Sequence, residues 1–282
     1  MSHVAARSFN EQIVESGNHV MLTRSFSAIA LVVFIYDTTI TFDDEVRFLW
    51  PKRWSTIKFC VYCNRLLSLG FLALNAIQTG PIRLTLSNHF CSVFFPMSGW
   101  VAFVSFGMCN WILLARTNAL LNRMKFFQCF LFTLFVVTYA ITGGLVVDAT
   151  IGLQGKMFRS NMFNACATSQ LPQLMPYLWI PPMTFETTMF ILTVWRVHGN
   201  INFTVSLGSD LWAVWFRDGV WYYLVIILLR GINLVSWLVL PAAYAFSGLF
   251  VLWAVMSISV TRLQINLSKS VDLGSRRQWN EM

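Results

Sequence analysis

Seven long apolar segments dominate the chain and restrict the folds open to it. A helix needs about 20 mostly apolar residues to cross the hydrocarbon core of a bilayer. The chain holds seven segments of about that length. We therefore predict an all-α integral membrane protein, built as a seven-transmembrane-helix bundle. The predicted spans are residues 21–42, 56–77, 90–115, 126–147, 176–195, 219–240 and 242–262.

The shortage of charge supports a membrane environment. Only 11% of the residues are charged and 56% are hydrophobic, whereas a soluble domain has about 25% charged residues. Such a chain cannot cover a water-facing surface of ordinary polarity, so lipid must be its solvent over much of its length. The net charge of +8 does not indicate nucleic-acid binding, because the basic residues lie in short segments between apolar runs. The expected partner is the lipid bilayer.

The last two predicted spans are separated only by Pro241 and the stretch Ala242-Ala243-Tyr244, so one long kinked segment is an alternative. The apolar run over residues 219–260 is about twice the length of one span, which favours two crossings. The predicted organisation is a polar N-terminal tail (1–20), a membrane domain (21–265) and a cytosolic C-terminal tail (266–282). We expect the first span to act as its own insertion signal.

The distribution of Lys and Arg predicts the orientation, because cytosolic loops of membrane proteins are enriched in these residues. With the N-terminus outside and the C-terminus in the cytosol, 13 of the 20 basic residues lie in cytosolic segments, 5 lie outside and 2 lie within helices. This bias favours that orientation and agrees with an odd number of spans. The cytosolic basic residues are Arg47, Lys52, Arg53, Lys58, Arg116, Arg123, Lys125, Arg196, Arg217, Arg262, Lys269, Arg276 and Arg277.

Two of the six cysteines are placed to form a disulfide. Four of them lie inside predicted spans. Only Cys91, at the outer end of the third span, and Cys166, in the loop between the fourth and fifth spans, lie on the oxidising side. In a compact bundle that loop passes over the outer end of the third span, which favours a Cys91–Cys166 bridge. The alternative is two free buried thiols.

Four ionisable residues lie inside predicted spans, where each charge costs roughly 2.5–3.5 kcal/mol and therefore needs a partner or a function. Asp37 and Arg65 lie at similar depth in the first and second spans, so adjacent antiparallel helices allow them to pair. Glu186 and Arg230 lie near the midplane in the fifth and sixth spans, so the geometry allows a second pair. Two interpretations stay open. The pairs form a polar binding site or switchable ion lock, or they only fix helix register.

The remaining polar residues indicate packing rather than chemistry. We expect Asn64, Asn75, Asn110 and Asn233 to donate hydrogen bonds between helices, and Asp218 to cap the start of the sixth span. The four histidines are scattered over tails and loops, and the chain has no Gly-rich phosphate loop, nucleophile elbow or acidic metal cluster. We therefore expect no enzyme activity, no cofactor and no metal site.

A pattern of polar and aromatic residues covers residues 26–70. It consists of Tyr36, Asp37, Thr41, Glu45, Val46, Trp50, Asn64 and Arg65. The pattern resembles the N-terminal domain of unknown function number six-five-three-three of fungal, mainly basidiomycete, multi-pass membrane proteins. A looser likeness continues through Arg217, Asp218 and Gly219, whereas Leu66 departs from the family pattern. That family has no established activity, so the resemblance implies a topology and a fungal origin but no mechanism.

The leading functional hypothesis is a receptor-like seven-helix protein of the plasma membrane, with an unknown ligand and a cytosolic signalling partner. Against it, Leu114-Ala115-Arg116 stands where receptors of this architecture have Asp-Arg-Tyr. The rival is a small transporter or channel that uses Asp37, Arg65, Glu186 and Arg230 as a polar pathway near the midplane. A membrane scaffold without a ligand is a third hypothesis.

Overall fold

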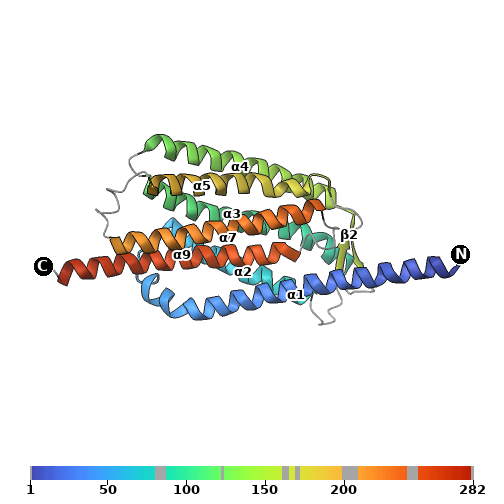
Figure 1. The fold of residues 1–282 in the computed structure, drawn as a ribbon. Helices are drawn as coiled ribbons and strands as arrows, with labels where there is room; N and C mark the ends of the chain where they lie inside the picture. Colours follow the sequence, from blue (N-terminus) through green and yellow to red (C-terminus); the bar gives the residue numbers. More distant parts are fainter. Residues whose placement is uncertain are drawn as a thin grey trace.

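A computed structural model shows a bundle of long helices with aligned axes (Figure 1). It describes residues 2–79, 87–121, 124–160, 165–168, 172–198, 209–239 and 247–280. Within these residues there are seven long helices, with a short 3-10 helix, η1, before the fifth. The helices are α1 (Ser2–Phe48), α2 (Thr56–Thr79), α3 (Asn88–Leu120), α4 (Lys125–Leu153), η1 (Met175–Trp179), α5 (Ile180–His198), α7 (Ser209–Val239) and α9 (Ser247–Asn280).

The helices cover the predicted spans and extend beyond them. α1 begins at Ser2 and α9 ends at Asn280, so most of both predicted polar tails is helical. Extending an existing helix costs little because each added residue gains a hydrogen bond, whereas starting a helix is unfavourable. For the same reason α7 begins at Ser209, ahead of the predicted start at Gly219. The prediction that Asp218 caps this helix is therefore wrong, since Asp218 lies within α7.

Two separate helices, α7 and α9, occupy the last apolar run, so the single kinked segment is excluded. They pack against each other, and the side chain of Asn233 on α7 donates a 3.3 Å hydrogen bond to the carbonyl of Gly248 on α9. A Cβ atom at Gly248 would lie 2.7 Å from the Asn233 Oδ1. Glycine at this position therefore permits the close approach of the two helices.

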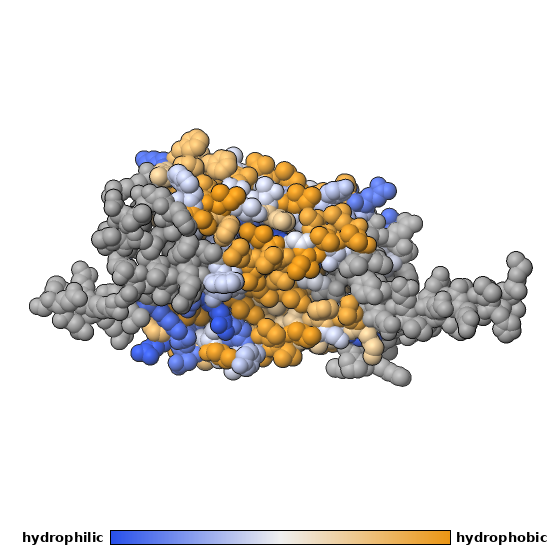
Figure 2. All heavy atoms as spheres, viewed as in Figure 1, coloured by the Kyte–Doolittle hydropathy of each residue, from blue (hydrophilic) through white to orange (hydrophobic). Residues whose placement is uncertain are grey.

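The surface of the bundle is apolar where a soluble protein would be polar. Figure 2 shows apolar side chains over the middle of the visible face, with hydrophilic residues toward both ends and most of them toward the C-terminal end. Within the residues that the structure describes, six helices are long and apolar enough to cross a membrane, namely α1, α2, α3, α4, α7 and α9. The chain is thus an integral, multi-pass membrane protein. Exposed apolar residues of these helices include Ile29, Val33, Ile40, Val136, Ile141, Leu228 and Ile232.

The fifth helix differs from the other six. α5 has 19 residues, contains Glu186 and is not among the six candidate spans found within the described residues. It packs between α4 and α7, and η1 packs against the same two helices. Pro176 lies in the first turn of η1, and Pro181 and Pro182 lie in the first turn of α5, where proline costs no helical hydrogen bond.

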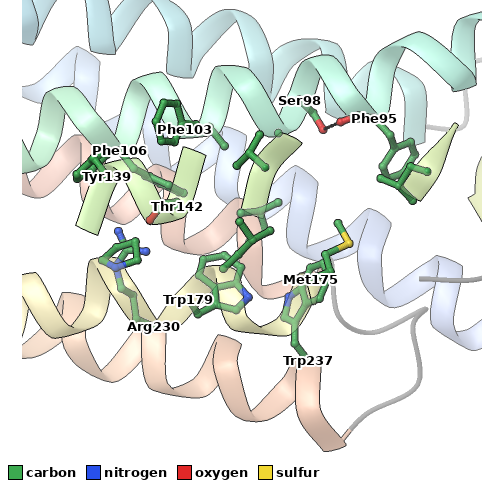
Figure 3. Close-up of a pocket in the computed structure, with 17 residues that line it drawn as sticks. Phe95, Ser98, Phe103, Phe106, Tyr139, Thr142, Met175, Trp179, Arg230 and Trp237 are labelled. Carbon is green, nitrogen blue, oxygen red and sulfur yellow. Dashed lines mark hydrogen bonds between the residues drawn. The ribbon is translucent and has the colours of Figure 1, made fainter. Parts of the chain in front are cut away.

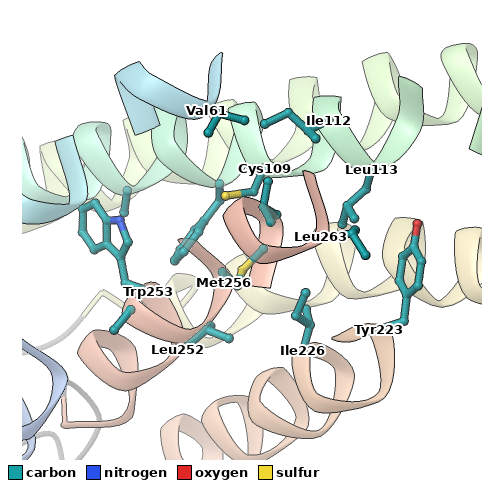
Figure 4. Close-up of a cluster of buried hydrophobic side chains, with 14 of the residues drawn as sticks. Val61, Cys109, Ile112, Leu113, Tyr223, Ile226, Leu252, Trp253, Met256 and Leu263 are labelled. Carbon is teal, nitrogen blue, oxygen red and sulfur yellow. The ribbon is translucent and has the colours of Figure 1, made fainter. Parts of the chain in front are cut away.

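Helix α9 forms the centre of the bundle. In its apolar span 61% of the residues are buried, against 22–33% in the other five candidate spans. It contacts α1, α2, α3 and α7, and a helix buried on all sides is expected to be apolar or internally satisfied all round. Figure 4 shows the core cluster, in which Met256 and Leu263 of α9 lie near Ile112 and Leu113 of α3 and Ile226 of α7.

A short antiparallel hairpin, which the all-α prediction did not include, lies at the end of the bundle where α3 begins. Strand β1 (Met157–Ser160) pairs with β2 (Ala165–Thr168). The hairpin contacts α3, and Cys166 of β2 forms a disulfide with Cys91 in the first turn of α3, with the two Cα atoms 5.4 Å apart. We call this the hairpin end of the bundle.

We predict that this disulfide stabilises the hairpin end. Replacing Cys91 with Ala should lower the free energy of unfolding by about 2–4 kcal/mol, the usual contribution of a native disulfide. Thermal unfolding in detergent, followed by tryptophan fluorescence, would measure the change, and reductant should lower the Tm of the wild type but not of the Cys91→Ala variant. The half-buried free thiol of Cys63 provides the control, because Cys63→Ala should stay reductant-sensitive. A wild-type Tm that reductant leaves unchanged would contradict the prediction.

Candidate functional site

The candidate site is a cavity in the half of the bundle that carries the hairpin. Its volume is about 110 Å³, it is partly open, and its walls come from α3, α4, η1, α5, α7 and α9 (Figure 3). Most of the wall is aromatic or aliphatic. The aromatic residues that line it are Phe95, Phe103, Phe106, Tyr139, Trp179 and Trp237.

Small residues on one face of α3 leave the space that the aromatic rings enclose. Ser98, Gly99 and Ala102 line the cavity, and their spacing of three to four residues places them on the same helix face. A Cβ atom built on Gly99 would meet no atom within 4 Å. Pro96 precedes them and, lacking an N–H group, removes one helical hydrogen bond from this part of α3.

A buried ion pair lies where the cavity reaches the middle of the bundle. The Arg230 Nε of α7 donates a 2.6 Å hydrogen bond to the Glu186 Oε2 of α5, and the side chains are 1% and 0% exposed. The structure thus brings together these two residues of the sequence prediction. Arg230 also lines the cavity. Because breaking a buried pair leaves an uncompensated charge, α5 and α7 are held in one relative register.

The guanidinium of Arg230 has weaker partners on its other sides. One of its terminal nitrogens, Nη2, lies 3.4 Å from the thioether sulfur of Met256 on α9, which is a weak acceptor. Its Cζ lies 5.1 Å from the ring centroid of Phe106 on α3, a cation–π distance. Among the described residues, the Glu186 Oε1 has no hydrogen-bond partner. The pair is therefore neutral overall but retains hydrogen-bonding capacity.

A polar cluster next to the core joins α2, α3 and α9. Ser105 donates a 2.6 Å hydrogen bond to the Asn64 Oδ1, the Asn64 Nδ2 donates to Ser257 at 3.0 Å, and the Trp253 Nε1 donates to Ser105 at 2.8 Å. All four residues are buried. Because lipid offers no alternative partners, such bonds help helices to associate in a membrane.

The other three asparagines also bond to a neighbouring helix, so the prediction of their role is confirmed. Asn75 of α2 donates to Ser27 of α1 at 2.6 Å, and Asn110 of α3 donates to the hydroxyl of Tyr139 on α4 at 3.0 Å. Asn233 bonds to Gly248, as described above. Each of these hydrogen bonds holds one pair of helices in a fixed register.

Three ion pairs lie at the end of the bundle opposite the hairpin, which we call the ion-pair end. Asp37 of α1 accepts a 2.5 Å hydrogen bond from Arg262 of α9, and Asp44 accepts one from Lys269 at 2.5 Å. The third pair is formed by Glu45 of α1 and Arg65 of α2.

The predicted Asp37–Arg65 pair is therefore wrong. Arg65 reaches along α1 instead, where it donates a 3.0 Å hydrogen bond to the carbonyl of Thr38 and pairs with Glu45. Asp37 pairs instead with Arg262 of α9, a helix far from α1 in the chain.

A matched spacing signals the α1–α9 contact. Asp37 and Asp44 are seven residues apart, and so are their partners Arg262 and Lys269. Seven residues are close to two helical turns, so each set lies on one helix face. Because the residue numbers of the acidic set and of the basic set rise in the same direction along the contact, the spacing requires that α1 and α9 are parallel and in register. This pattern of opposite charges was available in the sequence and was missed.

The turn between α1 and α2 is closed by a lysine. The Lys58 Nζ donates to the carbonyls of Trp50 and Lys52 at 3.0 and 2.8 Å and lies over the ring of Trp54. Of the other motif residues, Thr41 bonds back to the carbonyl of Asp37, Tyr36 and Trp50 are exposed, and Val46 is half-buried. Arg217, Asp218 and Gly219 lie in α7, but their side chains fall outside the described residues.

We predict that the Asp37–Arg262 pair stabilises the protein. Asp37→Asn should cost an amount in the lower part of the range of about 1.5–3 kcal/mol for a hydrogen bond to a charged group, because Arg262 is 42% exposed. Asp43→Asn, at an exposed neighbouring position, should change the Tm little. A double-mutant cycle with Arg262→Gln measures the coupling, and strictly additive losses would contradict the pairing.

The comparisons with known proteins concern the first two helices. Residues 25–70 match the family described as "Family of unknown function (DUF6533)". No curated protein matches the chain. The matched residues include Asp37, Asp44, Glu45, Lys58 and Arg65, that is, the α1 and α2 members of the ion-pair end. Residues 25–70 are thus similar to this N-terminal family of unknown function, and in the structure they form the second half of α1, the charged turn and most of α2.

Proposed function

We propose that the protein is a receptor-like membrane protein with seven crossings, an outside N-terminus and a cytosolic C-terminus, which binds a small ligand in the cavity. The observation that carries the proposal is that the cavity ends on the Arg230–Glu186 pair. A ligand there would touch Arg230 of α7, whose partners Glu186 and Met256 lie on α5 and α9. Occupancy would therefore bias the relative position of these three helices.

The orientation rests on two independent features. The disulfide at the hairpin end requires an oxidising compartment, and Lys and Arg are concentrated in the segments predicted to be cytosolic. The two ends of the chain lie at opposite ends of the bundle in Figure 1, as an odd number of crossings requires. Both features support the hairpin end as the outer end and the ion-pair end as the cytosolic end.

The seventh crossing in this proposal is α5 together with η1. At 1.5 Å per residue, the 19 residues of α5 extend about 28 Å, and the five residues of η1 add about 10 Å. The sum exceeds the hydrocarbon thickness of about 30 Å. Burial of Glu186 against Arg230 removes the most polar side chain of α5 from lipid.

Helix α9 provides the connection between the two ends. Leu249 near its start lines the cavity, Met256 contacts Arg230, and Arg262 and Lys269 pair with α1 at the other end. We propose that a cytosolic partner binds at the ion-pair end and that its binding depends on the position of α9. The proposal places the protein in the plasma membrane and includes no catalytic step.

The rival function is transport, and the Glu186 Oε1 favours it. A carboxylate oxygen without a hydrogen-bond partner among the described residues, in the interior of a membrane bundle, is a potential proton site. Packing of Ile112, Leu113, Ile226 and Leu263 fills the space beyond the pair toward the ion-pair end. This packing supports a cavity that opens to one side, as a receptor needs.

We predict an outside N-terminus and a cytosolic C-terminus in a eukaryotic host. A glycosylation-acceptor tag fused to the N-terminus should be modified, whereas the same tag at the C-terminus should not be. The readout is a gel shift that glycosidase removes. Modification of both tags or of neither would mean an even number of crossings, and the crossing by α5 would then be wrong.

We also predict that the protein does not conduct protons. Proteoliposomes with a trapped pH dye should show the same proton flux as protein-free liposomes, for the wild type and for Glu186→Gln alike. The variant keeps an oxygen that can accept from Arg230. A proton flux in the wild type that Glu186→Gln abolishes would overturn the receptor proposal in favour of transport.

A further inference from the structure

We infer that the cavity takes a small uncharged molecule with a compact apolar body, about one ring in size, and one hydrogen-bond acceptor such as a carbonyl oxygen. This inference rests on the proposed function, because it concerns the same cavity, and it adds the chemical class of the ligand. Three properties of the cavity carry it, namely its size, its free donor and its charge balance.

The size limits the ligand to about one ring. An engineered cavity of about 150 Å³ binds benzene, and this cavity measures about 110 Å³ but is partly open, so a short substituent can extend from the ring. The walls present aromatic surface to a flat body, because two pairs of contacting rings line the cavity, Phe103 with Tyr139 at 5.7 Å and Trp179 with Trp237 at 6.2 Å between centroids. Aromatic rings stack favourably in such surroundings.

One donor in the wall has no partner among the described residues. Trp179 is 6% exposed and lines the cavity, and its Nε1 is covered by protein atoms yet makes no hydrogen bond, so a small shift of the indole brings this donor to an acceptor in the cavity. Figure 3 shows its indole between Arg230 and Trp237. The hydroxyls of Ser98 and Thr142 in the wall donate to backbone carbonyls of their own helices. A buried donor left unsatisfied costs about 1–3 kcal/mol, so a ligand with an acceptor oxygen gains by reaching Trp179.

The charge balance favours an uncharged ligand. Arg230 is already neutralised by Glu186 at 2.6 Å, so an anionic ligand would place a second negative charge beside Glu186 in a medium of low dielectric constant. A cationic ligand would face Arg230 itself across the wall. A carbonyl oxygen accepts a hydrogen bond without either penalty.

The test compares three fluorinated probes by ¹⁹F NMR on the full chain in nanodiscs. 4-Fluoroacetophenone has an aromatic ring and a carbonyl oxygen, 4-fluoro-α-methylstyrene has the same shape without the acceptor, and 4-fluorobenzoate is the anion. We expect saturable line broadening with the ketone, at least tenfold weaker binding of the styrene, and no saturable binding of the benzoate. Empty nanodiscs measure partition of each probe into lipid.

Two pairs of variants locate the binding. Trp179→Phe should weaken the ketone about tenfold and leave the styrene unchanged, whereas Trp221→Phe, at an exposed position of α7 outside the cavity, should change neither. Gly99→Leu should fill the cavity and abolish binding. Gly144→Leu is its control, because Gly144 is an exposed glycine of α4 that also has open space around it. Thermal unfolding of each variant checks that it is folded.

Several results would overturn the inference. Equal binding of ketone and styrene would show that the ligand needs no hydrogen-bond acceptor. Tighter binding of the benzoate would show that the cavity binds anions. Ketone binding that survives Gly99→Leu would show that the ketone binds outside the cavity. The absence of saturable binding by the ketone would also reject it. The terminal-tag experiment is independent of all these outcomes, so the ligand class can fail while the seven-crossing proposal holds, and the reverse.

Discussion

The need to neutralise one buried guanidinium organises the middle of this bundle. Arg230 is 1% exposed, and lipid or apolar side chains alone could not hold its charge. Glu186 supplies the countercharge, Met256 and the ring of Phe106 occupy its other sides, and these groups come from α5, α9 and α3. Four helices are thus fixed around one side chain. The cavity lies on the remaining side of the guanidinium, and Arg230 forms its wall toward the middle of the bundle.

Helix α9 links this centre to the charged end of the molecule. Its first turn contacts the cavity through Leu249. Its middle turns contact Arg230 through Met256 and hold the serine and asparagine cluster through Trp253 and Ser257, and its later turns pair with α1. Such a helix cannot shift along its axis without breaking bonds at several levels. In the proposed receptor function, a ligand in the cavity would therefore move α9 as a unit or leave it in place, which is two-state behaviour.

Much of this arrangement could be predicted from the sequence, and the failures have physical causes. The apolar spans and the depths of Glu186 and Arg230 follow from length and helical rise, and both are local properties. The partner of Asp37 depends on which face of α1 meets α9, a choice between helices far apart in the chain. The cavity is also non-local, because its aromatic walls come from positions as distant as Phe95 and Trp237. Strands of four residues are too short to give a pattern.

The boundaries of the DUF6533 match have a structural meaning that the sequence alone does not give. Within residues 25–70, Glu45 and Arg65 satisfy each other. Asp37 and Asp44 do not, since their partners Arg262 and Lys269 lie 225 residues further along the chain. An α1–α2 pair inserted alone would therefore hold Asp37 in the membrane without its cation, at a cost of roughly 2.5–3.5 kcal/mol. The matched segment thus supplies the acidic side of the α1–α9 interface, and α9, the last helix of the bundle, supplies the basic side.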